Sequence, residues 1–415
     1  MSRTAPPRIA VLGAGPVGVE AALYAVSLGL PVKVYERGQV GDNLRQWGHV
    51  RLFSPFGMNT TPLGRATLRA DSPRGKLPAD ADILTGHEHL AAYLEPLANS
   101  PLLRGCFVPT TTVVQVGRRG YLKGEGVGDV KRGQQPFRLL MRDGAGKESV
   151  EEADLVLDCT GCYGNPCHLG DGGIPALGET AARGAISWGV EDILGKRAEH
   201  FADRTTLVVG GGFSAATSVV LLARLAEKHS STWIVWLARS PGTTPIRRVV
   251  NDPLRERDLL AGKANMLATR GEGHVEYHPQ AHVTAVEQNK DGFALTATVG
   301  GQEQSWQVDR IIGNVGYEPN NRLYRELQIH ECYASMGPMN LAAALMKHAG
   351  GDCLSIPNQG ANTLKNPEPN YYILGAKSYG RNSNFLLETG FGQVREVFTL
   401  VANKANLDLY KAAKG

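Results

Sequence analysis

Short apolar runs separated by glycines recur along the chain and predict an alternation of strands and helices. Residues 8–36 have the pattern of a strand, a helix and a second strand that ends at Glu36. The same order returns over residues 206–237. Strands that alternate with helices are typical of parallel sheets built from βαβ units. The pattern therefore predicts an α/β protein with two Rossmann-like domains.

The first repeat carries a Gly-x-Gly-x-x-Gly sequence between its first strand and its helix. Gly13 permits a tight turn, Gly15 lets the backbone approach a pyrophosphate, and Gly18 lets helix and strand pack closely. The helix N-terminus offers N–H groups to the phosphates. Glu36, at the end of the second strand, is placed to accept hydrogen bonds from an adenosine ribose. Together these features predict a dinucleotide site.

The second repeat ends differently. Its glycines, Gly210 to Gly212, again precede a helix, but the strand over residues 233–237 is followed by Arg239 instead of an acid. Four more arginines follow: Arg247, Arg248, Arg255 and Arg257. Arginine at this place accommodates a 2′-phosphate, so the repeat predicts NADPH. The alternative is a solvated face whose arginines pair with Asp252, Glu256 and Asp258.

Both repeats close with a related segment. Residues 154–161 and 309–316 each place a glycine seven positions after an acid, and a tyrosine and a proline follow in both. With these features the sequence resembles the two-domain FAD/NAD(P)H flavoproteins. That superfamily includes thioredoxin-reductase-like enzymes and the flavin-containing and N-hydroxylating monooxygenases. The resemblance covers nearly the whole chain.

The resemblance implies an α/β fold of two Rossmann-like, three-layer ββα domains, with the NADPH domain inserted into a discontinuous FAD domain. The FAD domain would take residues 1–188 and 319–415, and the NADPH domain residues 189–318. Residues 322–368 fit the template poorly and are expected to form a lid or substrate-shaping insert. The residues expected to bind FAD and NADPH are Gly13, Gly15, Pro16, Gly18, Glu36, Arg37, Trp47, Val114, Thr160, Gly161, Gly210, Gly212, Phe213, Ser214, Ala215, Arg239, Gly316, Gly375, Ala376 and Gln393.

One loop departs from the family pattern. The superfamily usually has Gly-Asp there, and the aspartate binds the ribityl chain, whereas this sequence has Gly375-Ala376. That contact must therefore be made by another residue. Phe391 is expected to open the helix that follows, with its N-terminus toward the flavin.

Residues 158–168 contain three of the six cysteines. By resemblance, Thr160-Gly161 occupies the family's Thr-Gly positions, so the segment is interpreted as a flavin-contacting turn that carries cysteines. A metal site is not expected, because His168 is the one histidine nearby. The alternative is a working Cys159–Cys162 dithiol, although both positions at which related reductases carry their cysteine pairs lack cysteine here.

Two bound nucleotides imply hydride transfer from NADPH to the flavin, with the chemistry supplied by the cofactors. The resemblance favours a monooxygenase that oxygenates a small-molecule nitrogen, sulfur or carbonyl centre through a C4a-hydroperoxyflavin. Asn59 is the candidate catalytic residue, and the alternative is a structural role in which it caps a turn. The monooxygenase fingerprint F-x-G-x-x-x-H is not intact at residues 194–200. A reductase of a disulfide, quinone or protein acceptor and a non-catalytic redox sensor stay open.

Composition and charge narrow the expected partners. A net charge of +4 is too small to indicate nucleic acid, and no apolar run approaches the roughly 18–20 residues that cross a bilayer. The N-terminal residues lack the pattern of a signal peptide. Six cysteines in 415 residues do not resemble a secreted disulfide scaffold. We therefore expect a cytoplasmic enzyme with a small-molecule substrate, no nucleic-acid or membrane partner and no metal, and leave a homodimer open.

Overall fold

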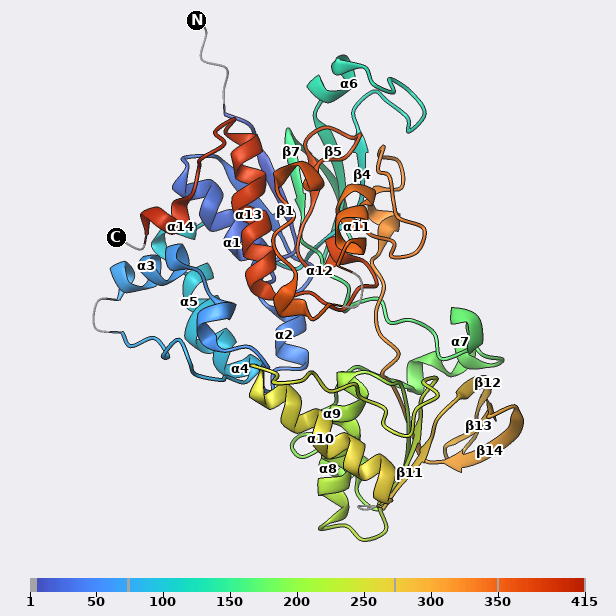
Figure 1. Ribbon diagram of the computed structural model, residues 1–415. Helices are drawn as coiled ribbons and strands as arrows, with labels where there is room; N and C mark the ends of the chain where they lie inside the picture. Colours follow the sequence, from blue (N-terminus) through green and yellow to red (C-terminus); the bar gives the residue numbers. More distant parts are fainter. Residues whose placement is uncertain (1–5, 73–74, 272–273, 349–350, 414–415) are drawn as a thin grey trace, which may run out of the picture. The chain divides into compact units, whose positions relative to one another are not determined.

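The computed structural model describes residues 6–72, 75–271, 274–348 and 351–413. The chain divides into two compact units (Figure 1). The first takes residues 1–48, 54–165 and 318–415, and the second residues 49–53 and 166–317. The α/β class is confirmed, since each unit has its own five-stranded parallel sheet. The chain enters the second unit after Asn165. From the sequence, the first part of the FAD domain was expected to continue to residue 188.

The first unit is built on a parallel sheet in the order β16-β7-β1-β2-β3. These strands are β1 Ile9–Leu12, β2 Val32–Tyr35, β3 Phe107–Val108, β7 Leu155–Asp158 and β16 Tyr371–Ile373. An antiparallel sheet contains β4 Thr111–Arg118, β5 Phe137–Asp143 and β6 Glu148–Ala153. The helices are α1 Pro16–Ser27, α2 Asp42–Gln46, α3 Pro62–Asp71, α4 Gly86–His89, α5 Glu95–Ala98, α6 Val130–Gln134, α11 Met339–Met346, α12 Ala376–Tyr379, α13 Leu387–Val401 and α14 Leu409–Ala412.

Strand β1 shows why this sheet is buried on both faces. Ile9 and Val11 belong to one core cluster with residues of α1 and α13. Ala10 and Leu12 belong to another, with Phe137 and other residues of the antiparallel sheet. Successive side chains of a strand point to opposite faces, so the parallel sheet lies between a helical layer and the antiparallel sheet. A strand covered on both faces has no polar alternation, which accounts for its wholly apolar sequence.

Helices α1 and α13 lie side by side in the helical layer (Figure 1). α13 begins at Leu387, one turn earlier than the start expected at Phe391. A Cβ at Gly390 would lie 2.6 Å from Val17 Cγ2, so the glycine lets the two helices approach closely. Farther along, the rings of Tyr24 and Phe398 stack with their centroids 5.0 Å apart.

The second unit repeats this plan. Its parallel sheet has the order β11-β10-β9-β15-β8, and its antiparallel sheet the order β12-β13-β14. Leu207 and Val209 face the antiparallel sheet, whereas Val208 faces the helices. The strands are β8 Ser187–Trp188, β9 Thr205–Val209, β10 Trp233–Leu237, β11 Val275–His278, β12 Ala281–Gln288, β13 Phe293–Val299, β14 Gln302–Val308 and β15 Arg310–Gly313, and the helices are α7 Glu179–Ala182, α8 Ala198–Phe201, α9 Phe213–Ala226 and α10 Arg255–Arg270.

The segment expected as a lid is partly built into the first unit's core. Leu323, Tyr324 and Leu327 are buried in the cluster that also contains Phe137 of β5. The described part of the segment thus begins with side chains that complete the layer between the two sheets of this unit.

A buried ionic cluster anchors the end of the same segment. The carboxylate of Glu368 is within 2.8 Å of both the Arg118 and the Arg132 guanidinium, and all three residues are at most 3% exposed. Gln328 N donates to the same carboxylate at 2.9 Å. Burial alone would raise the pKa of Glu368, but these donors and the two positive charges hold it below its ordinary value.

A single carboxyl group lies buried on α1. Glu20 is 1% exposed, and its carboxyl oxygens are 3.1 Å from Thr61 Oγ1. Burial raises the pKa of Glu20 to about 7, and hydrogen bonds with Tyr410 and Thr61 offset part of that effect. No helix among the described residues is long and apolar enough to span a membrane.

The buried carboxyl group predicts a pH-dependent stability. Because the pKa of Glu20 is about 7 when folded and about 4.5 when unfolded, the folded chain binds the proton more tightly. The free energy of unfolding should therefore fall as pH rises from about 4.5 to about 7, by about 3 kcal/mol. Glu20→Gln removes this titration, so the variant should match the wild type near pH 5 and exceed its stability at pH 8 in urea unfolding.

A second buried group makes the comparison with the variant necessary. Burial lowers the pKa of His89 to about 4, so His89 gives stability that is lost as pH falls below about 6.5, the opposite slope. The wild type and Glu20→Gln both contain His89, so the difference between their free energies of unfolding reports on Glu20 alone. Parallel stability curves for the two proteins between pH 5 and pH 8 would contradict the assignment.

Candidate functional site

The turn between β1 and α1 is shaped by three glycines. Gly13 has φ +92°, and a Cβ there would lie 2.8 Å from the Cys159 carbonyl oxygen. A Cβ at Gly18 would collide with the Gly13 carbonyl oxygen. Gly15 precedes Pro16, the first residue of α1, and no atom lies within 4 Å of a Cβ built on Gly15. Backbone atoms therefore crowd the turn at Gly13 and Gly18, whereas the space beside Gly15, at the N-terminus of α1, is free of them. The unpaired N–H groups of a helix N-terminus suit an anion.

Glu36 ties this turn to the end of β2. Its Oε2 accepts a hydrogen bond from Ala14 N and its Oε1 accepts one from Gly38 N, both at 2.8 Å. Each carboxylate oxygen keeps a further lone pair, so the side chain still has acceptors for a ribose. Arg37, which is exposed, follows it. Val114 is the extra residue at a bulge in β4, between Val113 and Gln115, which each pair with β5.

The turn after β7 adds a buried polar network that the sequence motifs did not assign. Asp158 Oδ1 accepts hydrogen bonds from Thr160 N at 3.2 Å and Thr160 Oγ1 at 2.7 Å. Its Oδ2 accepts from Tyr371 OH at 2.9 Å and Lys377 Nζ at 2.6 Å. Lys377 Nζ also donates to Thr160 Oγ1 at 3.1 Å. Burial and the neighbouring carboxylate raise the pKa of Tyr371 well above its ordinary value, so its hydroxyl keeps the proton that it donates.

A glutamine of α13 holds the turn at Gly375. Gly375 N donates to Gln393 Oε1 at 2.8 Å, and Gln393 Nε2 donates to Ser378 Oγ at 2.9 Å. Gln393 is 3% exposed, so its contribution to a ligand would act through this turn. Ala376, the first residue of α12, is half-buried and brings no polar side chain.

Two further predicted residues of this unit lie in separate settings. The Trp47 ring is 6.1 Å from the ring of Tyr163, which follows the Thr160-Gly161 turn. Asn59 is 2% exposed, and its amide accepts from Ser54 Oγ and donates to Ser54 O, both at 2.8 Å. Asn59 therefore fixes the turn over residues 54–59 through both ends of its amide.

No disulfide joins any of the cysteines among the described residues. Cys159 is buried, and burial, followed by the charge of Asp158, raises the pKa of its thiol. Cys162 Sγ is 3.9 Å from the Gly380 carbonyl oxygen. A thiol that stays protonated is a poor nucleophile, so the surroundings of Cys159 disfavour a redox dithiol. In the part of the chain that is described, no group of three or more His, Cys, Asp or Glu residues could hold a metal ion.

In the second unit, five of the predicted residues lie at the N-terminus of α9 or just before it: Gly210, Gly212, Phe213, Ser214 and Ala215. A Cβ at Gly210 would collide with the Asn314 carbonyl oxygen, whereas one at Gly212 has no atom within 4 Å. Phe213, Ser214 and Ala215 form the first turn of α9. Gly316, with φ +91°, follows β15, which is paired with β9.

The arginines after β10 divide into two kinds. Arg248 pairs with Asp258 through two hydrogen bonds of 2.8 and 2.7 Å, and Arg257 pairs with Asp252. Arg239 is exposed and, within the described ranges, makes no ion pair within 4 Å. The alternative of paired arginines therefore holds for part of the cluster and leaves Arg239 available to an anion.

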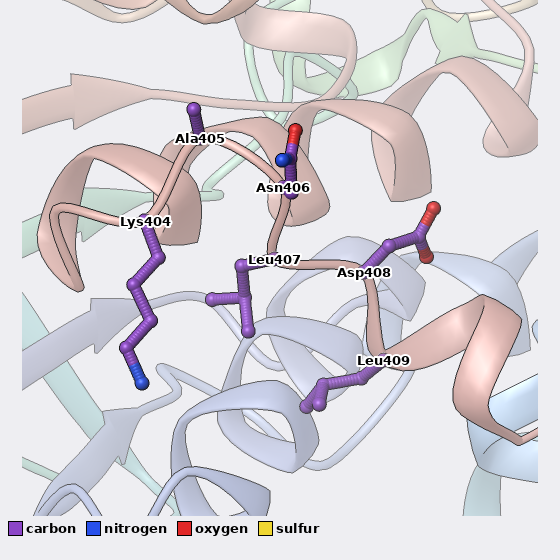
Figure 2. A pocket seen from close by; sticks show the side chains of 6 residues that line it. All are labelled: Lys404, Ala405, Asn406, Leu407, Asp408 and Leu409. Carbon is purple, nitrogen blue, oxygen red and sulfur yellow. The ribbon is translucent and has the colours of Figure 1, made fainter.

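Two surface hollows lie away from these residues. One of about 460 Å³ is lined by residues 404–409 of the first unit, and Figure 2 shows Lys404 and Leu407 pointing to one side of that turn and the Asp408 carboxylate to the other. Asp408 instead accepts hydrogen bonds from Tyr410 N and Lys411 N at the start of α14. The other hollow, of about 500 Å³, lies between α7 and β12. Neither contains a predicted site residue, so the glycine turns remain the candidate sites.

Comparison with solved structures confirms the fold. The chain resembles bacillithiol disulfide reductase from Bacillus cereus (TM-score 0.69, 17% identity, 96% of this chain and 99% of that chain). It also resembles DfoA, a cadaverine monooxygenase bound to FAD from Erwinia amylovora (0.65, 14%, 98% and 96%). A third likeness is thioredoxin reductase from T. acidophilum (0.59, 14%, 98% and 98%). No family model matches the sequence, and neither does any curated protein. The chain has the two-domain fold of these proteins.

The glycine turns yield a stability prediction with a matched pair of variants. Gly18→Ala must displace the Gly13 carbonyl and should lower the free energy of unfolding by about 1–3 kcal/mol. Gly15→Ala fits the open space and its φ of −74° suits alanine, so it should cost less than about 1 kcal/mol. Thermal unfolding of both variants measures the difference, and equal losses would show that backbone atoms do not crowd the turn at Gly18.

Proposed function

We propose that the protein is an FAD-dependent, NADPH-consuming oxidoreductase. The observation that carries the proposal is the contrast between two similar turns. Each turn has one glycine at a helix N-terminus, Gly15 or Gly212, where no protein atom lies within 4 Å of a built Cβ. The first is followed by the carboxylate Glu36, which suits ribose hydroxyls, and the second by the cation Arg239, which suits a phosphate.

In the first unit, the open side at Gly15 and the N–H groups of α1 would hold the pyrophosphate of FAD. The free lone pairs of Glu36 would accept hydrogen bonds from the adenosine ribose. The turns at Thr160 and Gly375 lie at the carboxyl end of the same sheet and would contact the rest of the cofactor. FAD, when bound, supplies the capacity to accept a hydride from NADPH and pass electrons to a second substrate.

We further propose monooxygenation of a small-molecule nitrogen, sulfur or carbonyl centre. The burial and raised thiol pKa of Cys159 support this, because a disulfide reductase that works through its own dithiol needs an accessible thiolate. The second candidate is a reductase, favoured by the whole-length likeness to a bacillithiol disulfide reductase. The two candidates differ in the fate of oxygen and in their need for cysteine.

The deciding experiment supplies the purified protein with FAD and NADPH in air-saturated buffer. A panel of primary amines, sulfides and ketones is scored by mass spectrometry for a product that has gained one oxygen atom. A monooxygenase gives such a product, consumes oxygen with NADPH, and is unaffected by prior alkylation of cysteine. NADPH oxidation that needs a disulfide or quinone and forms no oxygenated product would instead establish the reductase. A protein that oxidises no NADPH in any arm would exclude both.

Arg239 provides a prediction on nucleotide choice. Arg239→Gln removes a charge-assisted contact worth about 1.5–3 kcal/mol, so KM for NADPH should rise about 10–150-fold while KM for NADH changes little. Arg248→Gln is the matched control, because that side chain is already paired with Asp258. Steady-state NADPH and NADH oxidation checks both variants. Equal effects of Arg239→Gln on the two nucleotides would remove Arg239 from the phosphate site.

A further inference from the structure

A network of buried charged and polar groups surrounds Asp158, at the turn that follows β7. Asp158 is 0% exposed and Lys377 is 1% exposed, so their ion pair is shielded from water. Four donor groups reach the carboxylate, two from Thr160 and one each from Tyr371 and Lys377. The Lys377 ammonium also lies 5.0 Å from the centroid of the Tyr324 ring. A buried ion pair with this many partners is costly to assemble and fixes the groups that it contacts.

The network reaches the protein surface at one residue. Tyr371, Asp158, Lys377 and Tyr324 are all buried, whereas Thr160 is exposed. Thr160 also lies beside the turn between β1 and α1, since its Cα is 3.1 Å from the place of a Cβ built on Gly13. The buried Asp158–Lys377 pair can therefore affect a ligand through its hydrogen bonds with Thr160.

The hydrogen bonds determine what Thr160 can offer. A threonine hydroxyl has one proton and two lone pairs. The proton is donated to Asp158 Oδ1, and one lone pair accepts from Lys377 Nζ. One lone pair is left, so the hydroxyl can face a ligand only as an acceptor. An ionised phosphate, which offers acceptors alone, has no hydrogen bond to make there.

We propose that Lys377 and Asp158 are positioning residues that hold the Thr160 hydroxyl as an acceptor for a hydrogen-donating part of the flavin cofactor, a ribityl hydroxyl or a ring N–H. This rests on the proposed binding of FAD by the first unit. It also gives a source for the contact that Ala376 cannot make, because that residue has no polar side chain.

The test measures the dissociation constant for FAD by flavin fluorescence in a set of variants. Thr160→Val removes the acceptor and should weaken FAD binding about tenfold, whereas Thr160→Ser should bind like the wild type. The double variant D158L/K377M replaces the buried pair by apolar side chains and leaves the hydroxyl free to rotate, so it should weaken binding, but by less than Thr160→Val. The triple variant that also carries Thr160→Val should bind FAD as weakly as Thr160→Val alone and no more weakly, because the buried pair acts through that one hydroxyl.

Glu368→Gln is the control for general damage to the first unit. It disrupts an equally buried ionic cluster that lies before β16, whereas Lys377 lies after it. It should lower the unfolding temperature and leave the FAD dissociation constant unchanged. If the donor is the ring N–H, the bound-flavin absorption bands should shift in Thr160→Val and not in Thr160→Ser or Glu368→Gln. Unshifted bands with the same loss of affinity in Thr160→Val assign the donor to the ribityl chain.

The outcomes separate this inference from the proposed function. A wild type that binds no FAD overturns both. A wild type that binds FAD, together with a D158L/K377M variant of equal affinity or losses that multiply in the triple variant, overturns the inference alone. If D158L/K377M does not fold, Thr160→Val and Thr160→Ser decide, and equal affinity of Thr160→Val and the wild type overturns the inference.

Discussion

The close approach of two backbone turns is the constraint on which the first unit's site depends. The carbonyl oxygen of Cys159 lies 2.8 Å from the place of a Cβ on Gly13, and the carbonyl oxygen of Gly13 lies 1.9 Å from the place of a Cβ on Gly18. Because β1 and β7 are parallel neighbours that pair Leu12 with Asp158, both turns leave the sheet at the same edge. Any side chain at these glycines would separate the turns, and the open face at Gly15 would lose its shape.

Three buried carboxyl groups of this unit, those of Glu20, Glu368 and Asp158, have different consequences. Glu20 on α1 hydrogen-bonds Thr61, and Glu368 before β16 pairs with Arg118 and Arg132. These partners are all buried, so the effects of both carboxyl groups are on stability and on its pH dependence. Asp158 differs because one of its partners, Thr160, is exposed at the glycine turn. A shielded carboxylate that accepts hydrogen bonds thus affects stability at Glu20 and Glu368, whereas at Asp158 it also fixes an exposed hydroxyl, which we propose contacts the cofactor.

The parts of the fold that depend on local pattern could be predicted from the sequence. The strands over residues 32–35 and 233–237 have the expected bounds, because an apolar run between turns is itself the signal. The start of α13 could not be predicted, because Leu386 precedes the first helical residue, Leu387, and its side chain gives no capping hydrogen bond that would mark the helix start. The pairing of Lys377 with Asp158 joins residues 219 positions apart, and no single-sequence spacing indicates it. An aspartate that ends an apolar strand was the only local sign of that network.

The most direct test of the central claim is hydrogen–deuterium exchange of the whole chain with and without FAD. Binding at the carboxyl edge of the first sheet predicts slower amide exchange in residues 13–18, 158–161 and 375–378 on addition of FAD, and unchanged exchange in the Arg118–Glu368 cluster. Protection elsewhere in the chain with none in these three turns would contradict the account.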